Sequence, residues 1–175
     1  MVMIGMGRGR CGFITLFMVL LALWSPLSAF ASQACQTSEE QVFLCHAKEK
    51  TAAICYAKSS GLFTYRFFRG EKLEMIYPSD SATSGRDAFR FSSTPYSGGG
   101  EAHIRFRVGD YTYLIYDRNF RQPDGGLDSA NGVAVRMGSN TVAHLRCDND
   151  ASIAQQAYNF MPKESFEELG DQSIK

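Results

Sequence analysis

Three histidines, His46, His103 and His144, are the side chains of this chain best suited to acid–base or metal chemistry. A metal site or a catalytic base needs a second ligand or a proton partner at matching spacing. No two of the histidines lie at ligand spacing with a cysteine or carboxylate nearby, and no G-x-S-x-G motif marks a nucleophilic serine. The sequence therefore predicts solvated surface histidines, with no metal, no cofactor and no catalytic residue, and it favours a non-enzymatic protein.

Two loop motifs have alternative interpretations. Residues 97–100, Ser-Gly-Gly-Gly, have the composition of a phosphate-binding loop, but Glu101 and a predicted strand follow instead of a helix N-terminus. Asp124, Asp128 and Asn131 offer hard oxygen ligands for calcium, but the alternation of an EF-hand loop is missing. We therefore expect a strand connector in the first case and an ordinary turn in the second.

Basic side chains occupy outward positions on several predicted strands, whereas acidic side chains gather in loops and in the tail. If these strands are neighbours, the basic residues form a stripe suited to carboxylate, sulfate or phosphate groups. The alternative is that charged outward positions only keep the sheet soluble. The candidate partner-binding residues are His103, Arg105, Arg107, Arg90, Arg136 and Arg146.

The hairpin at residues 102–117 positions three of these candidates. Apolar and basic residues alternate along its first strand, which is the period-2 pattern of a half-buried strand. Gly109-Asp110 supplies a two-residue turn, and in that register His103, Arg105 and Arg107 face outward. The inward face then carries six large side chains: Ile104, Phe106, Val108, Tyr111, Tyr113 and Ile115.

Similar short runs follow one another along the rest of the chain. They predict an all-β fold, a single antiparallel β-barrel or flattened sandwich of about 8–9 strands joined as consecutive hairpins. Polar turn residues predict a long loop over residues 118–131. Helical spacing after Asp150, a predicted N-cap, indicates a short helix within a tail at about residues 151–170. The remaining predicted strands cover residues 41–47, 52–57, 62–68, 73–77, 87–92, 132–137 and 141–147.

The first 31 residues have the pattern of a signal peptide. Arg8 and Arg10 precede an uncharged apolar run, and Ala29-Phe30-Ala31 matches a cleavage signal. An uncleaved N-terminal anchor and a lipoprotein acylated at Cys35 are the alternatives. Cleavage leaves residues 32–175 as one domain of 144 residues with 16 basic and 18 acidic side chains, because both charged signal residues are arginines. This balance argues against a nucleic-acid binder, and no membrane span is expected after cleavage.

Four cysteines remain after cleavage: Cys35, Cys45, Cys55 and Cys147. An even number is typical of disulfide bonding in an oxidising compartment, and it allows three connectivities. We favour a bond between Cys45 and Cys55 within the first hairpin, and one between Cys35 and Cys147 that joins the ends of the domain. No C-x-x-C motif supports a thioredoxin-like or zinc-ribbon site.

The string LFTYRFFRGEKLEMIYP at residues 62–78 follows Cys45-x9-Cys55 and precedes Gly98-Gly99-Gly100 and a tyrosine-rich hairpin. With these motifs, the chain resembles small exported proteins of unassigned function from Gram-negative bacteria. The resemblance implies an all-β periplasmic or secreted domain, and it brings no catalytic residues.

Three functions are consistent with these patterns. The first is an exported, non-enzymatic binding module whose basic strand face meets a protein or an anionic glycan, in the manner of an inhibitor or immunity protein. The second is a β-barrel that binds a small ligand among its many aromatic side chains. The third is a hydrolase with a dispersed site, which a histidine–carboxylate pair in a cleft would support.

Overall fold

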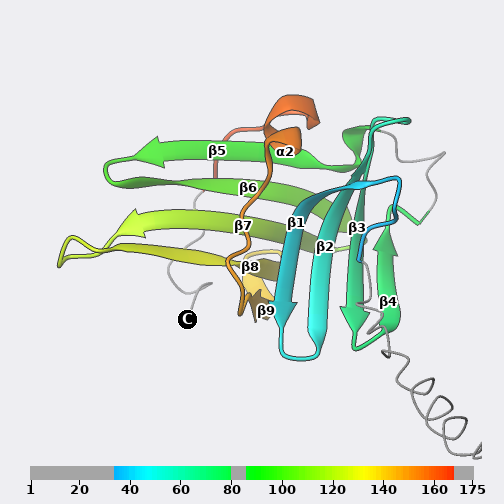
Figure 1. Cartoon of the computed structure of the whole chain (residues 1–175), viewed down its shortest axis with the longest axis horizontal. Coiled ribbons are helices and arrows are strands. Elements are labelled where there is room, and N and C mark those ends of the chain that lie inside the picture. Colours follow the sequence, from blue (N-terminus) through cyan, green and yellow to red (C-terminus); the bar gives the residue numbers. More distant parts are fainter. Residues whose placement is uncertain (1–33, 80–85, 168–175) are drawn as a thin grey trace, which may run out of the picture. The chain divides into compact units, whose positions relative to one another are not determined.

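Nine antiparallel strands form two open sheets in the computed structural model, which describes residues 34–79 and 86–167 (Figure 1). The predicted signal peptide, residues 1–31, and the end of the predicted helical tail lie outside the described residues. The all-β prediction is confirmed. Over the described residues the two sheets stay open and do not close into a barrel, so the structure follows the sandwich alternative more closely.

The first sheet is a four-stranded meander of two consecutive hairpins, as the sequence predicts. Its order follows the chain, because each strand pairs with the next through a short turn. Leu44 pairs with Ala53, and Ala53 with Arg66, so these residues share the outer face. The strands are β1 (Glu40–Ala47), β2 (Lys50–Ala57), β3 (Leu62–Arg69) and β4 (Lys72–Tyr77).

The second sheet is a five-stranded meander, and a 3-10 turn, η1 (Arg86–Ala88), leads into it. Val108 pairs with Tyr111 across the Gly109-Asp110 turn, which confirms the predicted register of the central hairpin. Figure 1 shows the strands of this sheet running across those of the first. The strands are β5 (Arg90–Tyr96), β6 (Gly99–Val108), β7 (Tyr111–Arg121), β8 (Leu127–Met137) and β9 (Asn140–Arg146).

The prediction of a long loop over residues 118–131 is wrong. β7 and β8 continue through this segment and leave only a short turn, in which the Gln122 N–H donates to the Gly126 carbonyl at 2.7 Å. Asn131 donates to the buried carboxylate of Asp117 at 3.0 Å from the neighbouring strand. Cross-strand pairing therefore overrides the turn preference of these polar residues. The fifth strand is also displaced, since residues 86–88 form a turn and β5 extends to Tyr96.

One hydrophobic core lies between the two sheets. Phe106 stands at its centre, where its ring contacts the rings of Tyr65 and Tyr77 from the first sheet and of Phe89 and Tyr113. Ile104 and Ile115 are fully buried beside it, as the alternation predicts. Tyr111 was also expected inside but is 44% exposed, because it lies at the end of its strand next to the turn.

Two disulfides join the four cysteines within the described residues, and their pairing differs from the one we favoured: Cys35 bonds to Cys55, and Cys45 bonds to Cys147. The physical reason is the pleat of the first sheet. Cys45 pairs with Ala52, and both point into the core, whereas Cys55 points to the outer face. Side chains on opposite faces of a hairpin cannot be bridged. The two disulfides indicate an oxidising compartment outside the cytoplasm.

The chain after β9 follows the edge of β1. Asp148 donates its N–H to the His46 carbonyl at 2.7 Å, and Ala154 does the same to Val42 at 2.8 Å. The helix α2 (Gln155–Phe160) is shorter than predicted and begins after Ala154, not at Asp150. In the part of the chain that the structure describes, no helix is long and apolar enough to cross a membrane.

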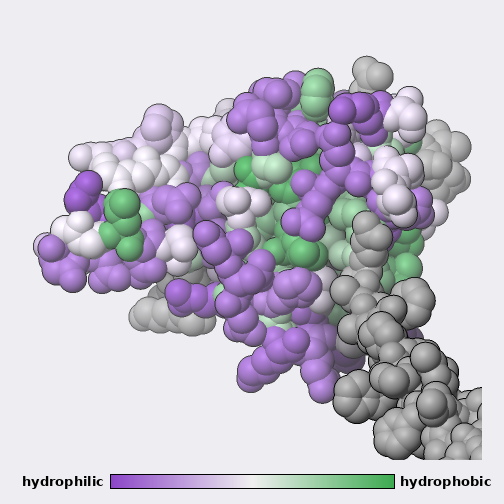
Figure 2. All heavy atoms as spheres, viewed as in Figure 1, coloured by the Kyte–Doolittle hydropathy of each residue, from purple (hydrophilic) through white to green (hydrophobic). Residues whose placement is uncertain are grey.

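Terminal segments cover the outer faces of both sheets. The N-terminal segment, residues 34–39, lies on the first sheet, where Cys35 is bonded to Cys55 and Glu39 binds Arg66. Figure 2 shows hydrophobic side chains gathered over β1 and β2 with hydrophilic ones around them. Residues 162–167, here called the C-terminal strap, lie against the second sheet, where Glu164 binds Arg105 and Phe166 stacks on His103.

Candidate functional site

The predicted basic residues do share one face. Register pairs Arg90 with Arg105 across β5 and β6, and Thr112 of β7 separates Arg107 from Arg136 of β8. These side chains all stand on the outer face of the second sheet, as alternation predicts. Arg146 stands on the outer face of β9, opposite Gly132. The strands that carry the candidates are therefore neighbours.

Two of these arginines are already bound by other groups of the same chain. The Arg105 guanidinium donates from Nε to Glu164 Oε1 at 2.8 Å, and a second nitrogen binds the other carboxylate oxygen. Arg90 donates to the carbonyls of Asp87 at 2.9 Å and Phe89 at 3.0 Å, which holds the turn before β5. Among the six candidates, Arg107 and Arg146 are exposed and Arg136 is half-buried.

The prediction that His103 is a solvated surface residue is wrong. His103 is only 1% exposed, because the C-terminal strap places Phe166 against its ring with the ring centroids 4.7 Å apart. His103 Nε2 lies 2.7 Å from Glu101 Oε1. This is the histidine–carboxylate pair that the hydrolase hypothesis requires. Among the described residues, however, no hydroxyl or thiol is hydrogen-bonded to the ring, so the pair lacks a nucleophile partner.

His144 is held by Tyr116, which crosses the outer face from β7 to β9. The Tyr116 hydroxyl and His144 Nε2 are 2.8 Å apart. Gly132 makes this crossing possible, because a Cβ there would lie 2.6 Å from the Tyr116 hydroxyl. Burial raises the pKa of Tyr116 to about 12. Burial, followed by the charge of Arg146, lowers the pKa of His144, so the imidazole is neutral near neutral pH.

A groove opens between the two sheets on the other side of β9, and we call it the intersheet groove. Its inner part has a volume of about 280 Å3. Tyr65 and Phe67 of β3 line it from the first sheet, and Tyr113 of β7 lines it from the second. Burial, with a smaller contribution from Tyr113, raises the pKa of Tyr65, so its hydroxyl remains a hydrogen-bond donor. The other apolar lining residues are Met75, Val133, Val135, Ala143 and Leu145.

The mouth of the intersheet groove is lined by charges. Lys50 and Arg69 lie where the inner part meets an outer hollow of about 480 Å3. Arg69 also donates to Glu74 at 3.0 Å, on the exposed surface. The outer hollow adds two cations, Lys48 and Arg146, against two acidic side chains, so positive charge predominates there. Those acidic residues are Glu49 and Asp148.

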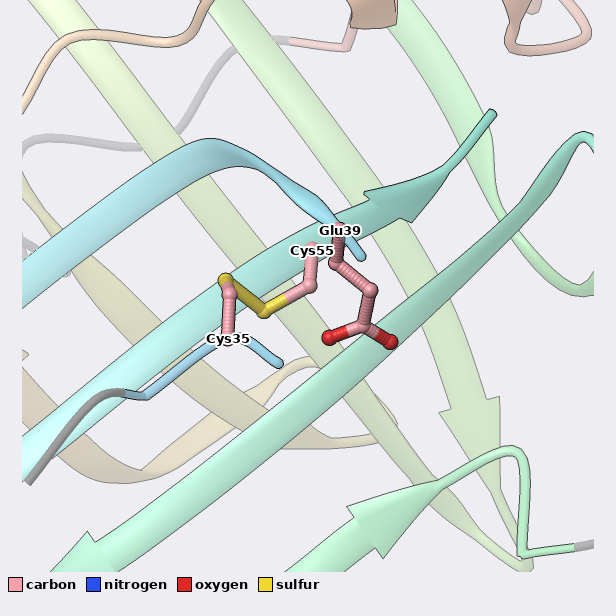
Figure 3. A group of neighbouring side chains, drawn as sticks. All are labelled: Cys35, Glu39 and Cys55. Carbon is pink, nitrogen blue, oxygen red and sulfur yellow. A yellow bond between two sulfur atoms is a disulfide. The ribbon is translucent and has the colours of Figure 1, made fainter. Parts of the chain in front are cut away.

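One cluster has ligand types that suit a metal. Cys35, Cys55 and Glu39 bring their sulfur and carboxylate atoms within 4.8 Å of one another (Figure 3). The two sulfur atoms are bonded to each other, and the carboxylate of Glu39 receives the guanidinium of Arg66. Since metal binding needs free thiolates, this cluster is a structural joint and not a metal centre.

The loop considered for calcium is an ordinary turn. Asp124 Oδ1 accepts the N–H of Gly126 at 2.9 Å, and Asp128 accepts an N–H from the Gln122 side chain at 2.7 Å. These contacts use the carboxylates to close the turn between β7 and β8. The glycine run at residues 98–100 belongs to the turn between β5 and β6 and the start of β6, as a strand connector does.

No family model, no curated protein and no solved structure matches this chain. The assignment of function therefore depends on the geometry of the candidate sites. Sequence reasoning found the outer-face arginines but missed the intersheet groove, because Tyr65, Phe67 and Tyr113 were expected to be packed in the core. A usable signal was present: the first and third turns of the first sheet, at Lys48-Glu49-Lys50 and Arg69-Gly70, carry basic residues, and alternate turns of a meander lie at the same end.

Proposed function

We propose that this protein is an exported, non-enzymatic binding module that holds an anionic ligand with an apolar part in the intersheet groove. The single observation that carries this proposal is the combination of an aromatic, aliphatic floor with a cationic mouth. We place the protein in the periplasm of, or outside, a Gram-negative bacterium, because its disulfides and its predicted signal peptide agree with export and its sequence resembles exported Gram-negative proteins.

The size of the groove limits the ligand. About 280 Å3 lies just below the lower end of the range typical of small-molecule sites, about 300 Å3, so the inner part fits one ring system or a short acyl chain. The outer hollow of about 480 Å3 leaves room for a larger polar portion beyond the mouth. A ligand with a buried apolar part in the inner groove and an exposed anionic part in the outer hollow matches this arrangement.

The charges at the mouth set the polarity of the ligand. Arg69 offers planar donors to a carboxylate, sulfate or phosphate group, and Lys50 adds a flexible cation beside it. The hydroxyl of Tyr65 stays protonated and adds a neutral donor deeper in the groove. An anionic glycan would use the mouth, but its polar rings would leave the aliphatic floor unfilled, so an amphipathic anion fits better.

The proposal is tested with 8-anilinonaphthalene-1-sulfonate, an aromatic anion whose fluorescence rises in apolar sites. We expect one molecule to bind per folded chain. The double variant Lys50→Gln/Arg69→Gln should bind at least about tenfold more weakly, since a hydrogen bond to a charged group contributes about 1.5–3 kcal/mol. Ala143→Trp, which fills the groove from β9 without changing charge, should also weaken binding.

The matched control is Lys58→Gln/Arg107→Gln, which removes the same charge at exposed positions away from the groove. It should bind the probe as the unmodified protein does. Thermal melting must be unchanged in every variant, because the probe also binds partly folded chains. Equal affinity of the groove and control variants would overturn the proposal.

A further inference from the structure

The C-terminal strap is bound to the second sheet as an added strand. The N–H of Phe91 donates to the Pro162 carbonyl at 2.9 Å, and the N–H of Glu164 donates to the Phe91 carbonyl at 2.9 Å. This makes a parallel bridge between Phe91 of β5 and Lys163. The Lys163 ammonium lies 4.1 Å from the centre of the Phe91 ring. The edge of β5 therefore accepts an extended segment through main-chain hydrogen bonds.

The side chains of the strap show what chemistry the outer face accepts. Glu164 forms a two-point contact with the Arg105 guanidinium, which is the geometry with which arginine recognises carboxylates. Two residues later, Phe166 stacks on the ring of His103. His103 is in turn fixed by Glu101, so the stacking surface is preformed. The face thus has an edge for a backbone, a cation for a carboxylate and a flat ring for an aromatic group.

The fit of the strap is incomplete. A small cavity of about 30 Å3 remains beneath it, with Arg105 and Arg136 on one side and Glu164 and Glu167 on the other. The Nε atom of Arg136 is buried and has no hydrogen-bond partner among the described residues. Native structures satisfy most buried donors, so the strap leaves a donor of this face unused. A better-matched carboxylate would gain that contact.

The strap is held by noncovalent contacts alone. Its ion pair with Arg105 is partly solvated, with the arginine side chain 34% and the glutamate side chain 18% exposed. No disulfide fixes it, since all four cysteines of residues 32–175 are bonded to one another elsewhere. A segment tethered in this way acts as an internal competitor at an effective concentration of the order of 1 mM. A partner segment must exceed that competition to bind.

We propose that the outer face around Arg105 and His103 binds an acidic, aromatic-bearing extended segment of a partner protein, which displaces the C-terminal strap. The strap is then an autoinhibitory occupant that keeps the surface covered until such a segment arrives. This inference is independent of the intersheet groove, because it uses other residues on the opposite face of the second sheet. It also gives a role to the basic outer face that alternation predicts.

The test uses a blocked peptide with the sequence of the strap, Pro-Lys-Glu-Ser-Phe-Glu, as the probe. It is added at up to about 1 mM to the full-length protein, and binding is followed by two-dimensional amide NMR. The unmodified protein should respond weakly, because its own strap competes. The full-length variant Glu164→Gln/Phe166→Ala should bind the peptide at least about tenfold more tightly, since its binding surface is open for a larger fraction of the time. Amide signals of Phe91, His103 and Arg105 should shift.

Two additions to that variant serve as the matched pair. Arg105→Gln should weaken peptide binding about fivefold, because it removes a partly solvated ion pair. Arg107→Gln, on the same strand and face but outside the contact with Glu164, should leave it within about twofold. Equal peptide affinity in the unmodified and Glu164→Gln/Phe166→Ala proteins, no binding to either, or equal effects of Arg105→Gln and Arg107→Gln would each overturn the proposal.

Hydrogen exchange of the unmodified protein gives a second readout that does not depend on a variant folding. The amide of Glu164 should exchange faster than the core amides of β2, because the strap opens locally without unfolding the sheets. Exchange of that amide only at the rate of global unfolding would also overturn the proposal. Binding of the anilinonaphthalene probe should be unchanged in the strap variants, so failure here and failure of the groove proposal are distinguishable.

Discussion

The two sheets cover their outer faces in similar ways and with opposite consequences. On the first sheet, residues 34–39 bring Glu39 to Arg66; on the second, the C-terminal strap brings Glu164 to Arg105. Both contacts are two-point arginine–glutamate pairs between a strand and a terminal segment. The two sheets therefore use the same type of ion pair, and the surroundings of each pair determine how firmly it holds its terminal segment.

The pair on the first sheet is buried and covalently reinforced. The side chains of Arg66 and Glu39 are 8% and 7% exposed, against 34% and 18% for Arg105 and Glu164. The Cys35–Cys55 disulfide anchors the same segment beside Glu39 (Figure 3). Leu44 and Phe68 pack against this joint and keep water away. The comparison indicates that the N-terminal segment is a permanent part of the fold, whereas the strap can be released.

The largest expected effect comes from breaking the buried pair. Glu39→Gln removes the charge that balances Arg66 and leaves a buried guanidinium unpaired, which should lower the free energy of unfolding by about 3–5 kcal/mol. Urea denaturation followed by circular dichroism measures this loss. Glu40→Gln is the matched control, because the neighbouring glutamate pairs with Lys58 on the exposed surface. Similar losses in the two variants would contradict the distinction between the sheets.

Acid titration sharpens the same point. Burial raises the pKa of Glu39, but hydrogen bonds from Arg66 and from the Gln36 N–H, with the charge of Arg66, outweigh it and lower the pKa below 4.5. A carboxyl whose folded pKa is depressed stabilises the fold at pH values above its unfolded pKa. That contribution is lost as pH falls through the lowered folded value. Unfolding free energies should therefore drop on the acid side in the unmodified protein and less steeply in Glu39→Gln.

The second effect comes from removing the covalent anchor. The double variant Cys35→Ala/Cys55→Ala opens a loop of 20 residues, for which chain entropy gives a loss of about 3 kcal/mol. Hydrogen exchange should show faster exchange at the Glu39 amide, which donates to the Gln36 carbonyl. Exchange at the Glu164 amide of the strap should not change. An unaltered Glu39 amide would mean that the ion pair alone holds the N-terminal segment.

Local patterns predicted much of this fold. Alternation at residues 102–108 and the Gly109-Asp110 turn fixed the register of the central hairpin, because a shift of one residue would move its apolar side chains to water. The even number of cysteines after a predicted signal peptide indicated disulfides. Their pairing, however, depended on which face of the sheet Cys45 and Cys55 occupy. Likewise, the segment predicted as a loop is part of two paired strands, in which Asn131 donates a hydrogen bond to Asp117. Contacts of this kind depend on the assembled sheet and are not visible in local sequence.

The candidate sites show the same limit. Alternation placed Arg105 and Arg107 on one outer face, and register confirms that they share it with Arg136. Alternation could not predict that Glu164, 59 residues after Arg105, forms an ion pair with Arg105. The intersheet groove was missed for a related reason, since whether Tyr65 and Tyr113 pack fully or line an opening depends on how the two sheets meet.

The smallest expected effect on stability comes from the strap. Arg105→Gln removes the counterpart of Arg66 on the second sheet, yet a partly solvated pair contributes only about 0.2–1 kcal/mol. Urea denaturation should therefore detect little change. Hydrogen exchange should resolve the change more clearly, because the amide of Glu164 reports the opening of the strap directly and should exchange up to about fivefold faster.

The control for Arg105→Gln is Arg107→Gln, which removes an exposed arginine from the same face. It should leave both the urea denaturation and the exchange of the Glu164 amide unchanged. A small loss of stability combined with faster exchange at Glu164 would mean that the strap opens independently of the sheets. A loss as large as that of Glu39→Gln would instead make the strap as permanent as the N-terminal segment. Since the two arginine–glutamate pairs have the same chemistry, only their burial and the neighbouring disulfide can account for the difference.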